Sequence, residues 1–79
     1  MFKILAYLLL TVESGKEEKV ANELLNFKKV KDTHILFGEY NIIAVVKTDN
    51  EADLKDFIAN DLGHIKNIQL LEILVETFI

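Results

Sequence analysis

The sequence of 79 residues contains no cysteine. Disulfide bridges, thiolate zinc sites and cysteine nucleophiles are therefore excluded, and the composition suits a reducing cytoplasm. A domain of this length has a marginal hydrophobic core, and without disulfides it is commonly stabilised by association with another chain. We expect one cytoplasmic domain, residues 1–79, that assembles with further copies of itself.

Glycine is scarce, and the three glycines stand singly at Gly15, Gly38 and Gly63. Neither a P-loop nor a GxGxxG fingerprint occurs, so no nucleotide cofactor is indicated. The two histidines, His34 and His64, have no acidic or histidine companion at metal-ligand spacing. The sequence therefore predicts no catalytic residue, no metal and no cofactor.

Basic residues are also few, since the sequence has nine basic and thirteen acidic side chains and a net charge of −4. A protein that binds nucleic acid through its phosphates needs the opposite sign. The only basic cluster, Lys28–Lys31, is expected to follow a helix, where cations interact favourably with the helix dipole. Direct binding of nucleic acid is not expected.

Long hydrophobic runs are missing as well. The run Ile4–Leu10 is far too short to span a membrane, and no small-residue cleavage site of a secretory signal follows it. Apolar residues instead alternate from Phe2 to Val12, so that one face is wholly apolar and the other largely so. This pattern predicts a central β-strand and no association with a membrane.

The rest of the chain predicts two helices and three further strands. Ser14 and Glu17 form an S-x-x-E capping box ahead of apolar residues at helical spacing, which explains the only serine without a catalytic role. Thr48–Asn50 precede a second helical pattern, which Gly63 is expected to end. The expected helices are residues 16–27 and 51–62, and the further strands are residues 33–37, 42–47 and 68–79.

This order, β-α-β-β-α-β, predicts an α+β ferredoxin-like fold with a four-stranded antiparallel sheet and two helices on one face. The first and third strands are the most apolar and are expected in the centre. The uncovered face, with Leu5, Tyr7, Leu9 and members of the last strand, is expected to form a dimer interface. The last strand is expected to alternate strictly, and its length would let it extend past the sheet toward a neighbour.

The segment Phe37–Ile42, with the sequence FGEYNI, lies between two apolar strands. Glycine adopts positive φ at little cost and asparagine is the next most tolerant residue, so this segment predicts a hairpin turn. Residues 11–25 and 30–62 resemble the ligand-sensing RAM domain of the Lrp/AsnC (feast/famine) transcription regulators. The most specific mark is the G-x-Y-D turn, here Gly38-Glu39-Tyr40-Asn41, and the similarity extends from Ile4 to about Val75.

The resemblance implies that such domains pair through their sheets, that the dimers join into rings such as octamers, and that free amino acids bind between dimers near the turn. The ligand-binding residues it implies are Gly38, Glu39, Tyr40, Asn41, Ile68 and Leu70. Asn41 replaces the usual Asp and removes a negative charge, although its amide can still accept a hydrogen bond from an ammonium group. Ile68 and Leu70 stand where members that bind polar amino acids often have threonines, which implies a more apolar ligand or a site that has lapsed.

The function implied is a non-enzymatic module that senses an amino acid, oligomerises and is able to co-assemble with full-length regulators. It would have no DNA-binding domain of its own. Two alternatives remain open: a structural assembly partner without a ligand, and a small dimeric ferredoxin-like enzyme. The enzyme is the weaker alternative, because it would depend on His34 as its only base.

Overall fold

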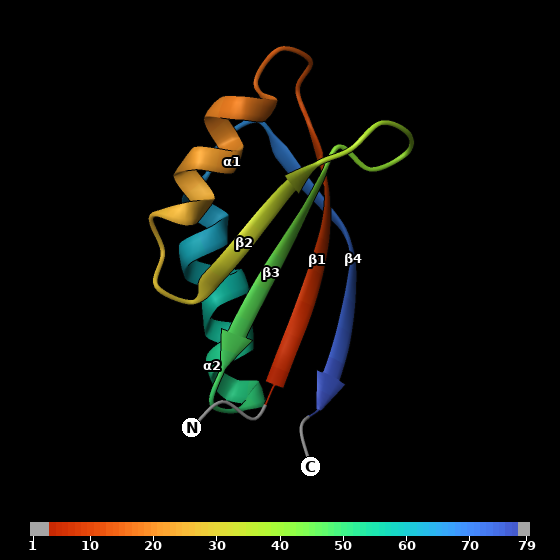
Figure 1. The fold of residues 1–79 in the computed structure, drawn as a ribbon. Helices are drawn as coiled ribbons and strands as arrows, with labels where there is room; N and C mark the ends of the chain where they lie inside the picture. Colours follow the sequence, from red (N-terminus) through yellow and green to blue (C-terminus); the bar gives the residue numbers. More distant parts are fainter. Residues whose placement is uncertain (1–3, 78–79) are drawn as a thin grey trace.

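The computed structural model describes residues 4–77, which form one four-stranded sheet and two helical segments (Figure 1). Phe2, Phe78 and Ile79, assigned to the outer ends of the first and last predicted strands, lie outside the described residues. The elements are β1 (Ile4–Val12), α1 (Glu17–Leu25), β2 (Val30–Ile35), β3 (Ile42–Thr48), α2 (Glu51–Asp56) with the turns η1 (Phe57–Asp61) and η2 (Leu62–His64), and β4 (Ile68–Thr77).

The order of elements confirms the predicted β-α-β-β-α-β fold. The strands lie in the order β2-β3-β1-β4, and every neighbouring pair is antiparallel. The first and third strands are therefore central, as their apolar sequences predict. Their helix-facing side chains are buried: Ala6, Leu8, Leu10, Val12, Ile42, Ala44 and Val46.

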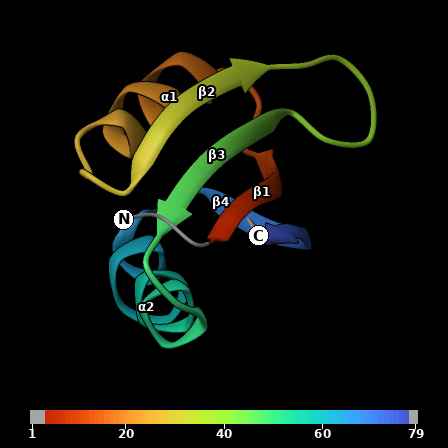
Figure 2. The ribbon, with the colours of Figure 1, turned by 60° about the horizontal axis from the view of Figure 1, so that its bottom comes forward.

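The two helical segments cover these side chains on one face of the sheet (Figure 2). Val20 and Leu24 of α1 and Phe57 at the start of η1 are almost fully buried. The rings of Phe27 and Phe57 meet edge to face, with their centroids 5.6 Å apart, which joins the two helical segments over the sheet. Leu25, expected beside the buried residues of α1, is exposed.

The predicted capping box at the start of the first helix is wrong. Ser14 lies in a turn that the Lys16 N–H closes on the Glu13 carbonyl at 3.0 Å, with Gly15 at a φ of +89°. The turn places Lys16 at the N-cap, without a side-chain hydrogen bond, and the Glu17 carboxylate accepts from the Gly15 N–H at 2.9 Å. Because the tight turn takes up Ser14, the helix begins only at Glu17.

The second helix begins as predicted and ends differently. Asn50 is its N-cap, and its side chain accepts a hydrogen bond from the Asp53 N–H at 2.8 Å. The predicted stop at Gly63 is wrong, because Gly63 does not adopt positive φ and lies within η2. The left-handed residue ahead of β4 is Asn67, with a φ of 70°, a conformation that asparagine tolerates better than most residues.

The second strand starts earlier and ends earlier than predicted. β2 begins at Val30, which is buried opposite Val46 of β3, and ends at Ile35. Lys28 and Lys29 follow α1, as expected of the basic cluster, whereas Lys31 already belongs to the strand. The burial of Val30 explains the early start, since a lone valine among lysines is a weak strand signal in the sequence.

The prediction that β4 alternates strictly is also wrong, because the strand contains a bulge. Leu10 is paired with Leu70, whereas Leu9 is paired with Glu72, so Leu71 is the extra residue. The cross-strand partners place Ile68 and Leu70 on the helix side together with Ile73 and Val75, rather than on opposite sides. The described part of β4 is paired with β1 throughout and does not extend past the sheet.

The face away from the helices carries the apolar side chains that the sequence places there. Leu5, Tyr7 and Leu9 of β1 are opposite Lys47, Val45 and Ile43 of β3, and none of them belongs to the cluster that packs against the helices, although Leu9 is buried. We call this surface the open face. Within residues 4–77, no helix is long and apolar enough to cross a membrane.

Candidate functional site

The predicted G-x-Y-D turn lies in the connection between β2 and β3, which projects from the end of the sheet (Figure 2). We call residues 36–41 the 36–41 loop. It is closed by a hydrogen bond from the Leu36 N–H to the Asn41 carbonyl at 2.7 Å. Gly38 has a φ of +129°, which side-chain-bearing residues rarely adopt. The prediction of a turn that needs glycine at this position is confirmed.

Asn41 fixes the base of this loop to β1. Its main-chain N–H donates to the Leu10 carbonyl at 2.8 Å, and its side-chain Oδ1 accepts from the Val12 N–H at 2.9 Å. The amide oxygen that was expected to meet a ligand ammonium group therefore already has a partner. The Asn41 side chain extends the pairing of β3 with β1 by one residue, which is a structural role.

Tyr40 points to a different surface. Its hydroxyl donates to the Glu72 carboxylate of β4 at 2.9 Å, although β1 lies between β3 and β4. Leu9, which is opposite Glu72, is only 9% exposed despite lying on the open face. The hydrogen bond to Glu72 and the negative charge of that carboxylate raise the pKa of Tyr40, and the charge of Glu39 adds to this effect.

A hollow of about 390 Å³ lies between the 36–41 loop and the start of α1. We call it the loop hollow. Gly38 and Asn41 are in its wall, while Glu39 and Tyr40 are not. None of the main-chain N–H groups from Phe37 to Glu39 has a hydrogen-bond partner among residues 4–77. The complete lining is Gly15, Glu17, Glu18, Ile35, Leu36, Phe37, Gly38 and Asn41.

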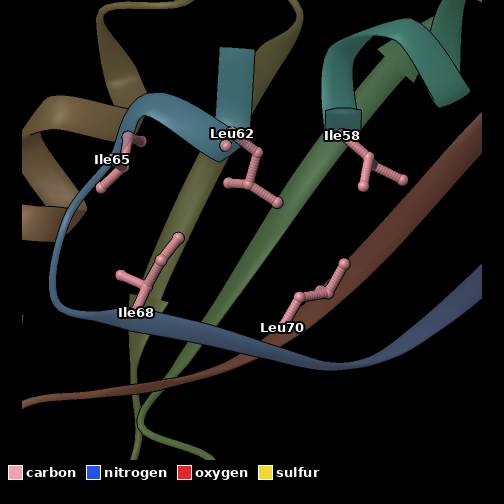
Figure 3. Close-up of a pocket in the computed structure, with 6 residues that line it drawn as sticks. Ile58, Leu62, Ile65, Ile68 and Leu70 are labelled. Atoms are coloured by element: carbon pink, nitrogen blue, oxygen red, sulfur yellow. The ribbon is translucent and has the colours of Figure 1, made fainter. Parts of the chain in front are cut away.

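Ile68 and Leu70 lie elsewhere, in the wall of a smaller cavity of about 200 Å³ between β4 and the end of the second helical segment. Figure 3 shows Ile68 and Leu70 facing Ile58 and Leu62 across this cavity. The predicted site residues other than Glu39 are thus divided among the loop hollow, the open face and this apolar cavity, and Glu39 is exposed and lines neither the hollow nor the cavity. Side chains that are neighbours in the sequence turn to different faces, which a motif alone does not reveal.

Sequence reasoning missed Glu17, Glu18 and Glu72 as site residues. The two glutamates of α1 line the loop hollow, and Glu72 binds Tyr40. Glu17 and Glu18 belong to residues 11–25, which resemble the family. That resemblance was the only signal in the sequence that could have pointed to these two glutamates. No signal indicated Glu72, because its contact with Tyr40 spans thirty-two residues of sequence.

Chemistry beyond binding finds little support in the described residues. His34 has an acidic neighbour that sequence spacing did not suggest, since its Nε2 lies 3.1 Å from Asp32 Oδ2, and both side chains are solvent-exposed. Within residues 4–77, no group of three histidine or acidic side chains is arranged to hold a metal ion.

Comparison with known proteins gives relatives of one kind. The HTH-type transcriptional regulator FL11 of Pyrococcus furiosus is 26% identical over 68 residues, which are 86% of this chain and 44% of that protein. FL11 of Pyrococcus abyssi is 25% identical over the same shares of both chains. The chain thus spans less than half the length of these curated relatives.

Solved structures also resemble this chain. Hypothetical protein PHS023 from Pyrococcus horikoshii has a TM-score of 0.90 and 31% identity, with 95% of this chain and 90% of that chain covered. FFRP-DM1 has a TM-score of 0.85 and 32% identity, with 92% and 97% covered. E. coli AsnC, at 21% identity with 94% and 50% covered, shares the fold with a TM-score of 0.80. The model of the Lrp/AsnC ligand binding domain matches residues 5–76, and the chain belongs to this family.

Proposed function

We propose that this chain is an amino-acid-sensing and oligomerisation module of Lrp/AsnC-type transcription regulation. The observation that carries the proposal is the loop hollow, which lies at the turn that carries the resemblance to the family and has unpartnered N–H groups beside it. Successive main-chain N–H groups in a turn can form a concave site that binds an anion. We infer that they receive the α-carboxylate of the ligand.

The other walls of the loop hollow suit the rest of an apolar amino acid. Glu17 and Glu18 supply negative charge for the ammonium group, a role that Asn41 Oδ1 does not have to fill. Ile35, Leu36 and Phe37 offer an apolar wall for the side chain. The hollow is open on one side, and we expect a second copy to close it, since a binding site normally covers most of its ligand.

The dimer is proposed to form through the open face. Leu5 and Tyr7, with Val45 and Ile43 beside them, are partly exposed on an apolar surface that the two helices leave uncovered, which commonly marks an interface. Co-assembly with full-length regulators through the same surface would explain how a chain of this kind affects DNA binding. We expect this to occur in the cytoplasm, with no reaction catalysed.

Native mass spectrometry with each proteinogenic amino acid tests the sensing role. The informative variant is Gly38→Ala, which strains the loop by about 1–3 kcal/mol because of its positive φ and should weaken ligand binding tenfold or more. Gly63→Ala is the matched control, since Gly63 has no positive φ and an added methyl group would meet only the Ile58 carbonyl oxygen, at an ordinary contact distance of 3.9 Å. If Gly38→Ala leaves ligand binding unchanged, the ligand-binding site does not lie at the 36–41 loop.

Two further outcomes separate the alternatives. Oligomers that never take up a ligand would leave the chain as a structural assembly partner. Mixing with a full-length homologue from the same cell tests co-assembly, and the absence of hybrid oligomers at micromolar concentration would exclude it.

A further inference from the structure

The side chains of the open face form three rows across the sheet, whose two edges are β2 and β4 (Figure 1). The rows arise because residues paired across antiparallel strands lie level and point to the same side. From β2 to β4, the rows are His34, Ile43, Leu9 and Glu72; then Asp32, Val45, Tyr7 and Leu74; and then Lys47, Leu5 and Glu76. In these rows the charged and titratable ionic side chains stand at the ends, and the centre is apolar.

Two copies of this sheet can pack face to face with nearly aligned strands about a two-fold axis in two ways. With the axis along the strands, β4 of one copy lies over β2 of the other, and each row faces the same row in reverse order. With the axis across the strands, β4 lies over β4, and the first row of one copy faces the third row of the other. The two arrangements therefore bring different charges together.

The charges at the ends of the rows distinguish between these arrangements. With the axis across the strands, Glu72 of each copy faces Glu76 of the other copy. Like charges placed opposite each other disfavour a contact between two proteins. With the axis along the strands, Glu72 instead faces His34, and the apolar centres of the rows meet. The charge pattern of the open face therefore favours the axis along the strands.

His34 and Glu72 each have an atom left for this contact. His34 Nε2 lies 3.1 Å from Asp32 Oδ2, and the other ring nitrogen, Nδ1, has no partner among residues 4–77. Glu72 accepts from the Tyr40 hydroxyl through Oε2, whereas its Oε1 has no partner in the same part of the chain. The phenol of Tyr40 is uncharged at neutral pH, so the negative charge of Glu72 is not compensated by it.

We propose that His34 of each copy donates through Nδ1 to Glu72 of the other copy, in an open-face dimer whose two-fold axis lies along the strands. The contact deepens the oligomerisation part of the proposed function and rests on the open-face dimer. An imidazolium has two N–H donors, whereas a neutral imidazole has one. Only protonated His34 can therefore donate to Asp32 and to Glu72 of the other copy at the same time.

The contact makes the strength of the dimer depend on pH. Each copy takes up a proton at His34 when the dimer forms, so the dimer is favoured at low pH and is weakened as the pH rises and the imidazole loses its charge. Histidine is the side chain that ordinarily changes its charge between pH 5 and 8, so the change falls near neutral pH.

Engineered cysteines test the arrangement, because the chain has no cysteine of its own. A chain with both His34→Cys and Glu72→Cys should form disulfide-linked dimers on mild oxidation, seen on a non-reducing gel. Within one copy these two positions are three strand spacings apart, about 14 Å, which is too far for a disulfide. A chain with Glu72→Cys and Glu76→Cys is the matched comparison, since it cross-links only if the axis lies across the strands. Cross-linking of this second pair, or of neither pair, would overturn the proposal.

Sedimentation equilibrium at pH 8 and at pH 6 tests the proton. The dissociation constant of the wild-type dimer should fall about tenfold or more from pH 8 to pH 6, and His34→Gln should remove most of this change. His64→Gln is the matched control, because His64 lies in η2 and contacts the Asn60 carbonyl, away from the open face. A pH response that is the same in the His34→Gln protein as in the wild type would overturn the contact.

The outcomes separate this contact from the rest of the proposed function. A wild-type protein that stays monomeric at both pH values would overturn the open-face dimer and the contact together. A dimer that forms without the cross-link between positions 34 and 72 would overturn only the contact. Ligand binding at the loop hollow does not enter either measurement, so the sensing role is tested independently.

Discussion

At the scale of single residues, the turn between β2 and β3 combines two structural roles that its motif does not distinguish. Asn41 connects the loop to β1, and Gly38 provides the main-chain conformation beside the hollow. An aspartate at position 41, usual in the family according to the resemblance, would present a carboxylate oxygen to the same Val12 N–H. The exchange of Asp for Asn therefore changes the charge of the turn while its anchor is kept.

This gives a paired prediction at position 41. Asn41→Ala leaves the Val12 N–H without its acceptor and should lower the free energy of unfolding by about 1–3 kcal/mol. Asn41→Asp should stay within about 0.5 kcal/mol of the parent, since it retains an acceptor. Urea denaturation measures both. Equal destabilisation by the two variants would show that the amide N–H groups, rather than Oδ1, hold the loop.

Tyr40 gives a prediction on pH. Its pKa is raised by Glu72, so the neutral phenol is the form that the folded protein favours. The stabilisation is present below the ordinary tyrosine pKa of 10.0 and is lost as the pH rises through the raised value. In a Tyr7→Phe background, where Tyr40 is the only phenol, ultraviolet titration should show Glu72→Gln lowering this pKa. Glu76→Gln is the control, and an equal effect from it would contradict the assignment.

At the scale of elements, hydrophobic periodicity predicts which segments become helices and strands, because each buries one face. Local polar signals are less dependable. Ser14 and Asn50 both look like N-caps in the sequence, but only Asn50 accepts a hydrogen bond from its helix. Ser14 does not cap its helix because it lies in the tight turn that the Lys16 N–H closes on the Glu13 carbonyl. The positive φ of Gly15 allows this turn.

The two caps make a direct comparison. Asn50→Ala should cost about 1 kcal/mol of stability, because the Asp53 N–H loses its acceptor. Ser14→Ala should change stability by less than about 0.5 kcal/mol, because Ser14 caps nothing. Thermal and chemical denaturation of both variants measure this. A larger loss of stability for Ser14→Ala would indicate that Ser14 does cap the first helix.

At the scale of the whole molecule, the fold could be predicted from the sequence, and of the candidate site only the turn between β2 and β3 could be predicted. The order of elements and the two central strands follow from apolar patterning alone. The hydrogen bond of Tyr40 to Glu72 and the separation of Ile68 from the turn depend on how distant segments are placed. Such relations are absent from a motif, which records neighbours in sequence only.

Assembly has a consequence for stability at this scale. If the open face is buried between two copies, the thermal unfolding midpoint should rise with protein concentration, because only the folded chain forms the dimer. Calorimetry over a hundredfold range of concentration measures this. Leu74→Glu places a charge on the open face opposite Tyr7 and should remove the dependence. A midpoint that is independent of concentration in the parent would argue against the dimer.

The bulge at Leu71 also bears on how relatives are compared. A relative whose last strand lacks the extra residue, aligned without a gap at Leu71, would have each later side chain matched to one on the opposite side of the sheet. Substitution patterns read from such an alignment would mix helix-facing positions with those of the open face. Interface residues in β4 should therefore be transferred between family members only after the bulge has been located in each of them.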